Sequence, residues 1–228
     1  MILGIDSSAV TAGCALYENG KIIAEQFLNN GHTHSETMLP MVESMLNNAG
    51  VTLADLDCIA VTAGPGSFTG LRIGIAAVKG MAVGAKKPCI AVSTLEAVAY
   101  NFMGFDCVVC ACMDARCGQV YNALFKAEGG IVSRLCEDRA IRAEELSREL
   151  SGIDGKIILA GDGAELMDNF TEHKYELAPY PLRYQRGSGV CFAAAGRNTI
   201  SAAALMPTYL RLPQAERERL WREKNGGV

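Results

Sequence analysis

Residues 2–27 read ILGIDSSAVTAGCALYENGKIIAEQF, and this segment determines how the chain begins to fold. It holds three apolar runs whose length and composition are typical of strands, at residues 2–6, 13–17 and 22–27. Asn19 and Gly20 separate the second run from the third, and an Asn-Gly pair favours the positive φ angles of a type I′ hairpin turn. The chain is therefore expected to open with an antiparallel meander of three strands.

A helix is predicted after the meander, because apolar residues recur every three or four positions from Met38 to Ala49. Thr33 and Glu36 have the spacing of a capping box, and Gly50 favours the end of the helix. Strands and helices then alternate as far as residue 104. We expect strands at 58–62 and 89–92, a glycine-rich loop at 63–70, and helices at 71–84 and 94–103.

The same order of elements starts again at residue 107. Strands are expected at 107–113, 119–126, 131–135 and 156–160, and helices at 143–150, from 164 onward, at 189–197 and at 215–224. Asp6 and Asp114 each end the first strand of a series, while Gly64 and Gly161 each open the loop after a fourth strand. A duplicated β-β-β-α-β-α-β-α unit is the plan of the actin, sugar kinase and Hsp70 superfamily.

This plan predicts an α/β fold of two tandem ribonuclease-H-like, actin-like lobes. The expected domains are residues 1–104, which carry the partner helices, and residues 105–228, whose charged terminal helix with Trp221 could pack back on the first lobe. Fold alone does not determine function, so the site residues must be argued separately.

Composition limits the possible functions. The chain has 228 residues, half of them hydrophobic, and a formal net charge of -4, which argues against a stand-alone nucleic-acid binder. Any contact with RNA is therefore expected to be indirect, through a basic partner. No basic leader or apolar run of membrane-spanning length is evident, and the nine cysteines lie in apolar runs typical of reduced, buried thiols. We expect a cytoplasmic protein with no membrane contact.

The turn IDSSAVTAG, residues 5–13, is the first candidate site. Backbone amides and hydroxyls can bind phosphate there, and a carboxylate can hold Mg²⁺. The alternative is a tight hairpin in which Asp6 accepts hydrogen bonds from turn amides. The candidate cofactor-binding residues, interpreted as vestigial phosphate loops, are Asp6, Ser7, Ser8 and Gly161. We expect ATP or ADP with Mg²⁺ only at a partner interface.

The stretch GPGSFTGLRIG, residues 64–74, is the most distinctive in the chain. It could bind an anion at a helix N-terminus, but no Gly-Lys-Ser/Thr of a Walker loop follows. A second interpretation is that small residues on one helical face, Gly70, Gly74, Ala77, Gly80 and Gly84, allow another helix to approach closely. We favour the helix interface, and expect Gly74→Leu to break pairing while the lobes stay folded.

Several blocks together resemble the TsaB (YeaZ) family, and they span almost the whole chain: IDSS at 5–8, HSETMLP at 34–40, GPGSFTGLRIG at 64–74, MDAR at 113–116, VY at 120–121 and PTYLR at 207–211. The resemblance implies a non-catalytic paralogue of TsaD, the subunit that transfers threonylcarbamoyl to a tRNA adenosine beside the anticodon. It also implies pairing with a TsaD-type paralogue, joined by a TsaE-type ATPase, and a homodimer when the chain is alone.

In this family the first-lobe helices form the pairing surface, here residues 36–48 and 71–85. The interface residues expected on that basis are Met38, Met41, Val42, Met45, Gly70, Leu71, Gly74, Ala77, Val78 and Met81. TsaD-like enzymes carry a His-x-x-x-His metal motif near the first helix. Here His34 is followed by Met38 at that spacing, so no metal site and no catalytic residue is expected.

Other chemistry has less support. Cys107, Cys110 and Cys112 have metal-like spacing, but alternation on a strand sends Cys107 to the face opposite the other two. A peptidase is disfavoured because the sequence has no Gly-x-Ser-x-Gly elbow. The leading hypothesis is a scaffold or activating subunit for threonylcarbamoyl transfer. The alternative is an ATP-dependent small-molecule kinase or ATPase. Asp6 and the Gly161 loop are the residues that favour it.

Overall fold

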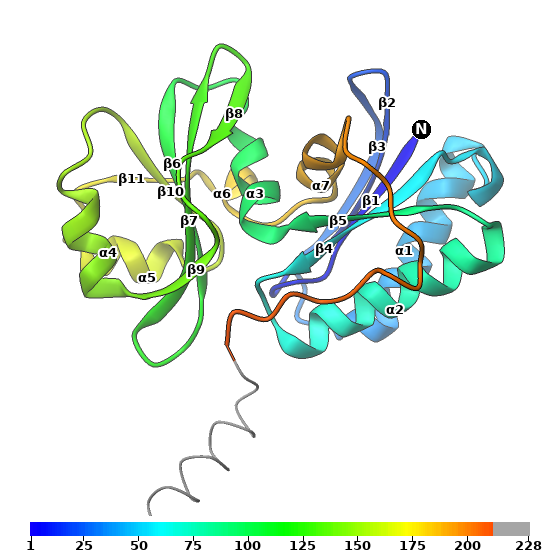
Figure 1. Ribbon diagram of the computed structural model, residues 1–228, viewed down its shortest axis with the longest axis horizontal. Coiled ribbons are helices and arrows are strands. Elements are labelled where there is room, and N and C mark those ends of the chain that lie inside the picture. The colour runs from blue at the N-terminus through cyan, green and yellow to red at the C-terminus, as the bar shows by residue number, and fades with distance from the viewer. Residues whose placement is uncertain (212–228) are drawn as a thin grey trace, which may run out of the picture.

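The computed structural model describes residues 1–211 of the 228-residue chain. Two mixed sheets, each with its own helices, lie side by side, and the short helices α3 (Thr94–Ala99) and α7 (Gly187–Ala194) lie near their junction (Figure 1). The helix predicted at 215–224, with Trp221, lies outside the described residues.

The first sheet has the strand order β3-β2-β1-β4-β5. Its first three strands form the predicted antiparallel meander, and Asn19 and Gly20 have φ angles of 49° and 83°, as the turn requires. The fourth and fifth strands run parallel to the first. The bounds are β1 (Ile2–Asp6), β2 (Ala12–Glu18), β3 (Lys21–Leu28), β4 (Cys58–Gly64) and β5 (Cys89–Ser93).

Helices cover both faces of the first sheet. On one face α1 (His34–Ala49) and α2 (Phe68–Ala85) pack on Leu3, Ile5 and Val61, while α3 and α7 pack on the other face. Thr33 is the N-cap of α1, but its hydroxyl bonds Ser35 and makes no capping bond, so the predicted capping box is wrong. Short 3₁₀ turns lie at η1 (Leu53–Asp55) and η2 (Tyr100–Phe102).

The second sheet repeats the first. Its order is β11-β10-β6-β7-β8, so each strand takes the place of its counterpart in β5-β4-β1-β2-β3. The predicted duplication of an actin-like lobe is therefore confirmed. The strands are β6 (Cys107–Asp114), β7 (Gln119–Glu128), β8 (Ile131–Arg134), β9 (Arg139–Arg142), β10 (Ile157–Ala160) and β11 (Glu176–Leu177), and the helices are α4 (Ala143–Leu150), α5 (Ala164–Phe170) and α6 (Tyr180–Arg183).

The assignment of every residue after 104 to the second lobe is wrong for α7, which packs on β1 and β2 of the first sheet. Glycines allow this contact: a Cβ on Gly187 would lie 2.4 Å from the Cys14 carbonyl carbon, and one on Gly4 2.7 Å from the Gly187 oxygen. The helix was predicted at 189–197 and begins two residues earlier. Strands β9 and β11 and helix α6 were not predicted.

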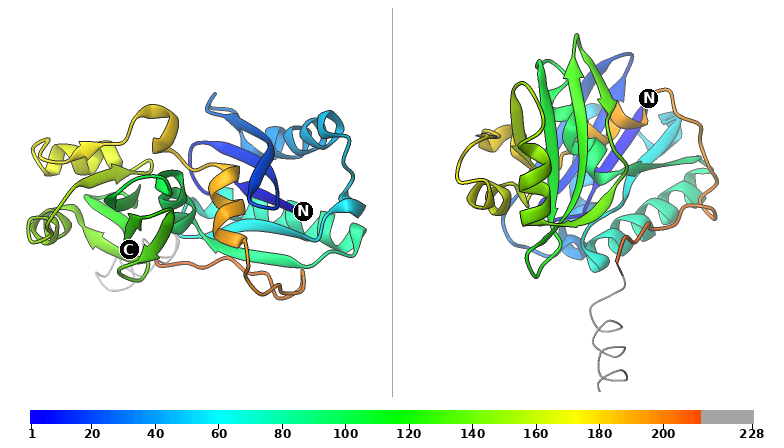
Figure 2. Two further views of the ribbon diagram at one scale, coloured as in Figure 1. Left: turned by 90° about the horizontal axis from the view of Figure 1, so that it is seen from above. Right: turned by 60° about the vertical axis from the view of Figure 1, so that its left-hand side comes forward.

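Beyond α7 the chain returns along the first lobe as a segment without helix, residues 200–211, which includes a turn at 202–204 and which we name the strap (Figure 2). Ile200 bridges Cys89 at the edge of β5, and Leu205 is fully buried against the core of α1 and α2. The Thr208 amide then donates to the Ala63 oxygen at 2.7 Å. The strap therefore covers the β5 edge and passes the N-terminal end of α2.

Two further sequence predictions can be checked here. Cys107 faces the core that contains α3, whereas Cys110 and Cys112 face the core that contains α4 and α5, so the predicted division between faces is confirmed. Helix α2 is, among residues 1–211, the one helix apolar and long enough to cross a membrane, a test that core helices also meet. One face of α2 packs on the first sheet.

Candidate functional site

The turn after β1 is closed by its own hydrogen bonds. The amide and hydroxyl of Ser8 each donate to Asp6 Oδ1 at 3.1 Å, and the same hydroxyl lies 3.0 Å from Oδ2. The Ser7 hydroxyl donates to the Gly70 oxygen at 2.9 Å. Burial raises the pKa of Asp6 to about 6, because the carboxylate is fully removed from water.

The glycine-rich block after β4 packs directly on this turn. A Cβ on Gly70 would lie 2.1 Å from the Ser7 oxygen, one on Gly66 2.5 Å from the Ser8 oxygen, and one on Gly74 2.3 Å from Ser7 Oγ. The Ser67 amide also donates to the Ser8 oxygen at 2.7 Å. Three glycines of the block are therefore required by contacts inside the first lobe.

The second lobe has an equivalent arrangement after β10. A Cβ on Gly161 would lie 2.0 Å from the Cys112 oxygen, so this glycine packs on the end of β6 as Gly70 packs on the turn after β1. The side-chain amide of Gln185 donates to Asp162 Oδ1 at 2.8 Å. Burial, with smaller contributions from Asp114 and Asp6, raises the pKa of Asp162 to about 6.

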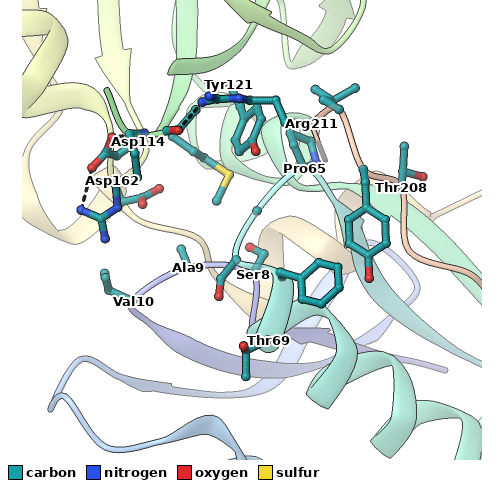
Figure 3. A pocket seen from close by; sticks show the side chains of 18 of the residues that line it. Ser8, Ala9, Val10, Pro65, Thr69, Asp114, Tyr121, Asp162, Thr208 and Arg211 are labelled. Atoms are coloured by element: carbon teal, nitrogen blue, oxygen red, sulfur yellow. Dashed lines mark hydrogen bonds and ion pairs between the residues drawn. The ribbon is translucent and has the colours of Figure 1, made fainter. Parts of the chain in front are cut away.

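A cleft of about 590 Å³ lies between the two sets of turns (Figure 3). First-lobe residues from the turn after β1 and the start of α2 line one wall, and Asp114, Arg116, Tyr121 and Asp162 line the other. Arg116 forms an ion pair with Asp114 at 3.1 Å. The strap closes part of the remaining wall with its residues 208–211.

Magnesium and nucleotide phosphate, which this fold family commonly binds in such a cleft, do not fit the first-lobe turn. The Ser7 and Ser8 hydroxyls are already donated to protein oxygens, and Asp6 is fully buried beneath them. Gly66 and Gly70, which would have to move away from the turn to make room for a phosphate, are in contact with the turn backbone. Of the residues predicted as vestigial phosphate loops, Ser8 lines the cleft, while Asp6 and Ser7 are buried and use their polar groups within the first lobe.

The position at which a second histidine would complete the His-x-x-x-His motif is occupied by a core residue, Met38. Met38 is 1% exposed inside the first lobe, and His34 Nε2 lies 2.7 Å from the Ala9 oxygen. No group of three His, Cys, Asp or Glu side chains that could hold a metal ion occurs within residues 1–211.

Most of the predicted interface residues are in the core of the first lobe. Eight of the ten are buried within the lobe, although Val42 also lines a hollow at the surface: Met38, Met41, Val42, Met45, Gly70, Leu71, Gly74 and Val78. Gly74→Leu stays a prediction, but its expected effect changes, because a Cβ at Gly74 would lie 2.3 Å from Ser7 Oγ inside the lobe. The apolar periodicity of a helix marks the face it buries in its own lobe.

A different face of the same helices is open. An apolar groove of about 740 Å³ runs between α1, η1 and the C-terminal half of α2, and a smaller hollow of about 390 Å³ adjoins it. Of the predicted interface residues, Ala77 and Met81 line it. The residues that sequence reasoning missed are Leu39, Leu53, Ala54 and Ala76, which line the groove. Val83, also on α2, is 69% exposed.

A signal for this face was present in the sequence. Ala76, Gly80 and Gly84 are spaced four residues apart, and this row is offset by two residues from the buried row that contains Gly74 and Val78. Two residues correspond to about 200° around a helix, so the two rows of small residues lie on opposite sides of α2.

Comparison with known proteins identifies the family. The family model described as "TsaD: tRNA N6-adenosine threonylcarbamoyltransferase" matches residues 21–203. The tRNA threonylcarbamoyladenosine biosynthesis protein TsaB of Bacillus subtilis (strain 168) is 32% identical over 219 residues, covering 94% of this chain and 96% of that protein. This chain belongs to the TsaB family.

Two further comparisons agree with this family. The TsaB protein of Escherichia coli (strain K12) is 34% identical over 165 residues, or 71% of each chain. The solved structure of YeaZ from Pseudomonas aeruginosa superimposes with a TM-score of 0.78 at 28% identity, covering 92% of this chain and 99% of that one. The resemblance stated from the sequence blocks is therefore confirmed.

Proposed function

We propose that this chain is a non-catalytic scaffold or activating subunit in the threonylcarbamoylation of tRNA adenosine. It pairs through the apolar groove with a TsaD-type catalytic paralogue, and a TsaE-type ATPase joins the pair in the cytoplasm. In the absence of that partner, a second copy occupies the same groove as a homodimer. The names of the TsaB relatives, which place them in threonylcarbamoyladenosine biosynthesis, support the pathway.

The observation that carries the proposal is the environment of Gly80 and Gly84. Both lie inside helix α2, where glycine costs about 1 kcal/mol relative to alanine. A Cβ on either residue would meet nothing within 4 Å, whereas one on Gly70 or Gly74 would collide with the turn after β1. Contacts within residues 1–211 therefore give no reason for these two glycines, and close approach of a helix from outside the chain does.

The groove fits a protein partner that presents an apolar helix. Leu39 is 51% exposed on one side, and the groove wall is built mainly from alanine, glycine, leucine and methionine. Exposed apolar patches of this kind mark protein interaction sites, and small residues let two helices come close. A TsaD-type paralogue would supply the equivalent helix from its own first lobe, because the matched family model covers this part of the chain.

The arrangement of the cleft supports the non-catalytic part of the proposal. Asp6 is buried and hydrogen-bonded by Ser8, and Met38 stands in the core at the position of a second histidine. The kinase or ATPase alternative needs free phosphate donors at the turn, and the Ser7 and Ser8 hydroxyls are donated elsewhere. A net charge of -4 favours tRNA contact through the partner and not through this chain.

The test compares two leucine substitutions by co-purification with the TsaD-type paralogue. Gly80→Leu fills the groove, while Gly104→Leu adds the same side chain at an exposed glycine that also has open space around it. Overpacking of about 1–3 kcal/mol predicts roughly 5- to 150-fold weaker pairing for Gly80→Leu, with Gly104→Leu unchanged. Equal retention of the partner by both variants would contradict the proposed interface.

A second assay tests the assigned role. The purified chain, given threonylcarbamoyl-adenylate and tRNA, is expected to form no modified nucleoside, and addition of the TsaD-type paralogue and TsaE-type ATPase is expected to restore the reaction. Modification by the chain alone would contradict a scaffold role. Activity of the complex without this chain would contradict an activating one.

A further inference from the structure

The strap is fixed firmly to the first lobe. Ile200 exchanges two backbone hydrogen bonds of 2.8 Å with Cys89, and Leu205 is fully buried. The Thr208 oxygen lies 2.2 Å from the Cβ position of Gly64, so this glycine has no room for a side chain. Backbone pairing, core burial and a fitted glycine together anchor residues 200–208.

An aromatic stack continues the anchoring as far as Tyr209. Its ring stacks on Phe68 with centroids 4.9 Å apart, and the Arg72 guanidinium lies 3.7 Å above the Phe68 centroid. Arg72 Nε donates to the Tyr209 hydroxyl at 3.0 Å. Because Phe68 and Arg72 both belong to the first turns of α2, the end of the strap moves with the first lobe.

Contact with the second lobe is made by the next charged residue. The Arg211 guanidinium donates to the Ala115 oxygen, across the cleft and directly after Asp114 at the end of β6 (Figure 3). Thr208 and Leu210 line the same cleft. The strap is thus held by many groups on the first lobe, and reaches the second lobe through the Arg211 side chain.

Further connections between the lobes are made at the turn after β1 and at α3. The Thr11 hydroxyl donates to the Gln185 oxygen at 3.2 Å, and the Gln185 amide donates to Asp162. Arg134 of β8 pairs with Glu96 of α3 at 3.3 Å. Figure 1 shows α3, α6 and α7 on one side of the junction and the strap on the other.

We propose that the strap is an interlobe clamp, in which Arg211 holds the cleft closed and its release lets the lobes swing apart about the α3 side. Hinge motions of two lobes concentrate at a few connecting residues, and a contact on the opposite side of the junction from them has the longest lever arm. The clamp is a property of the chain itself and does not depend on the occupant of the groove.

Distance measurements between spin labels test the clamp. Labels are placed at Asn48→Cys on α1 and Arg148→Cys on α4, both exposed, with Cys117 and Cys136 changed to serine because solvent reaches those thiols. Dilution with unlabelled chain removes distances between copies. Arg211→Ala is expected to shift the distribution to longer and broader distances. Arg142→Ala, which removes an exposed arginine from the second lobe, is expected to leave it unchanged.

The result that overturns the clamp is an Arg211→Ala distribution that superimposes on that of the parent chain. If Arg211→Ala does not fold, Arg211→Gln takes its place with the same expectation, because the shorter side chain retains a donor but loses the reach. Tyr209→Phe keeps the stack and the other anchors, so it is expected to give the parent distribution. A broadened distribution for Tyr209→Phe alone would place the clamp at Arg72 and contradict the role of Arg211.

Discussion

Gly74 leaves the space that Ser7 Oγ occupies: a Cβ on Gly74 would lie 2.3 Å from that oxygen. The hydroxyl in turn donates to Gly70, one turn earlier on α2, at 2.9 Å. The close approach of α2 to the turn after β1 therefore depends on a row of small residues. This contact belongs to the folding of the first lobe, while the opposite row with Gly80 is available to a partner.

Gly74→Ala is expected to lower the free energy of unfolding by about 1–3 kcal/mol, because the added methyl displaces a buried, hydrogen-bonded hydroxyl. Urea unfolding followed by circular dichroism measures the change. Gly104→Ala is the matched control, since Gly104 is exposed and has open space. A Gly74→Ala variant as stable as the parent would show that the turn can rearrange freely.

Gly80→Ala is expected to have the opposite sign. The Cβ meets nothing within 4 Å, so the substitution gains helix propensity without a clash and stabilises the isolated chain by about 0.5–1 kcal/mol. The same variant should bind the TsaD-type paralogue more weakly. Loss of stability in the purified chain would mean that α2 has intramolecular contacts at this face.

The raised pKa of Asp6 predicts that the stability of the fold decreases as pH rises. Its folded-state pKa of about 6 lies above the ordinary value of 3.8, so between these values the folded state binds more protons than the unfolded chain. Asp6→Asn removes this term, and the loss of stability between about pH 5 and about pH 8 should shrink by about 1–2 kcal/mol. Asp106→Asn, at an exposed carboxylate, is the control and should keep the parent's pH dependence.

Glu25 contributes stability with the reverse dependence on pH. Burial alone would raise its pKa, but hydrogen bonds from Arg186 and Ser188 outweigh it and lower the pKa. This stability is present at neutral pH and is lost as pH falls through the depressed value. Glu25→Ala leaves Arg186, at 25% side-chain exposure, without its carboxylate partner and should destabilise by about 3 kcal/mol in chemical unfolding.

The control for Glu25 is Glu128→Ala, which removes an ion pair with Lys126 from a side chain that is 64% exposed. Exposed pairs contribute about 0–1 kcal/mol, so little change is expected. Equal effects of the two substitutions would show that Glu25 does not hold the start of α7 on β3.

In a thiol titration, the cysteines should react in the order of their solvent exposure. Cys117 is exposed and Cys136 is half-buried, whereas the other seven are buried. Burial raises the pKa of Cys14 to about 12, which suppresses the reactive thiolate. Native protein should therefore modify first at Cys117 and later at Cys136, and denaturant should release the rest. Rapid modification of a third thiol, identified by mass spectrometry, would contradict the buried core.

Local sequence was sufficient for elements whose signals are local. The Asn19-Gly20 turn, the alternation of residues 107–113 and the repeated strand order predicted both sheets, because hairpin chemistry and strand periodicity depend on near neighbours. Short elements such as β9 (Arg139–Arg142) and β11 (Glu176–Leu177) escaped prediction, since pairing with β7 and β10 defines them more than their own composition does.

The sequence by itself determined the duplicated actin-like plan and the family, and it led to the proposal that α1 and α2 are the partner helices. Only the tertiary structure decided which face of those helices is open. Met38 and Gly74 belong to rows of apolar or small residues that recur at helical spacing. This periodicity reports the face that folding buries, so both residues lie in the core. The sequence places Gly80 and Gly84 on a row offset from that of Gly74, but only the surroundings of their Cβ positions show which row is buried and which is open. The return of α7 and the strap to the first lobe was likewise decided by contacts between residues far apart in the chain.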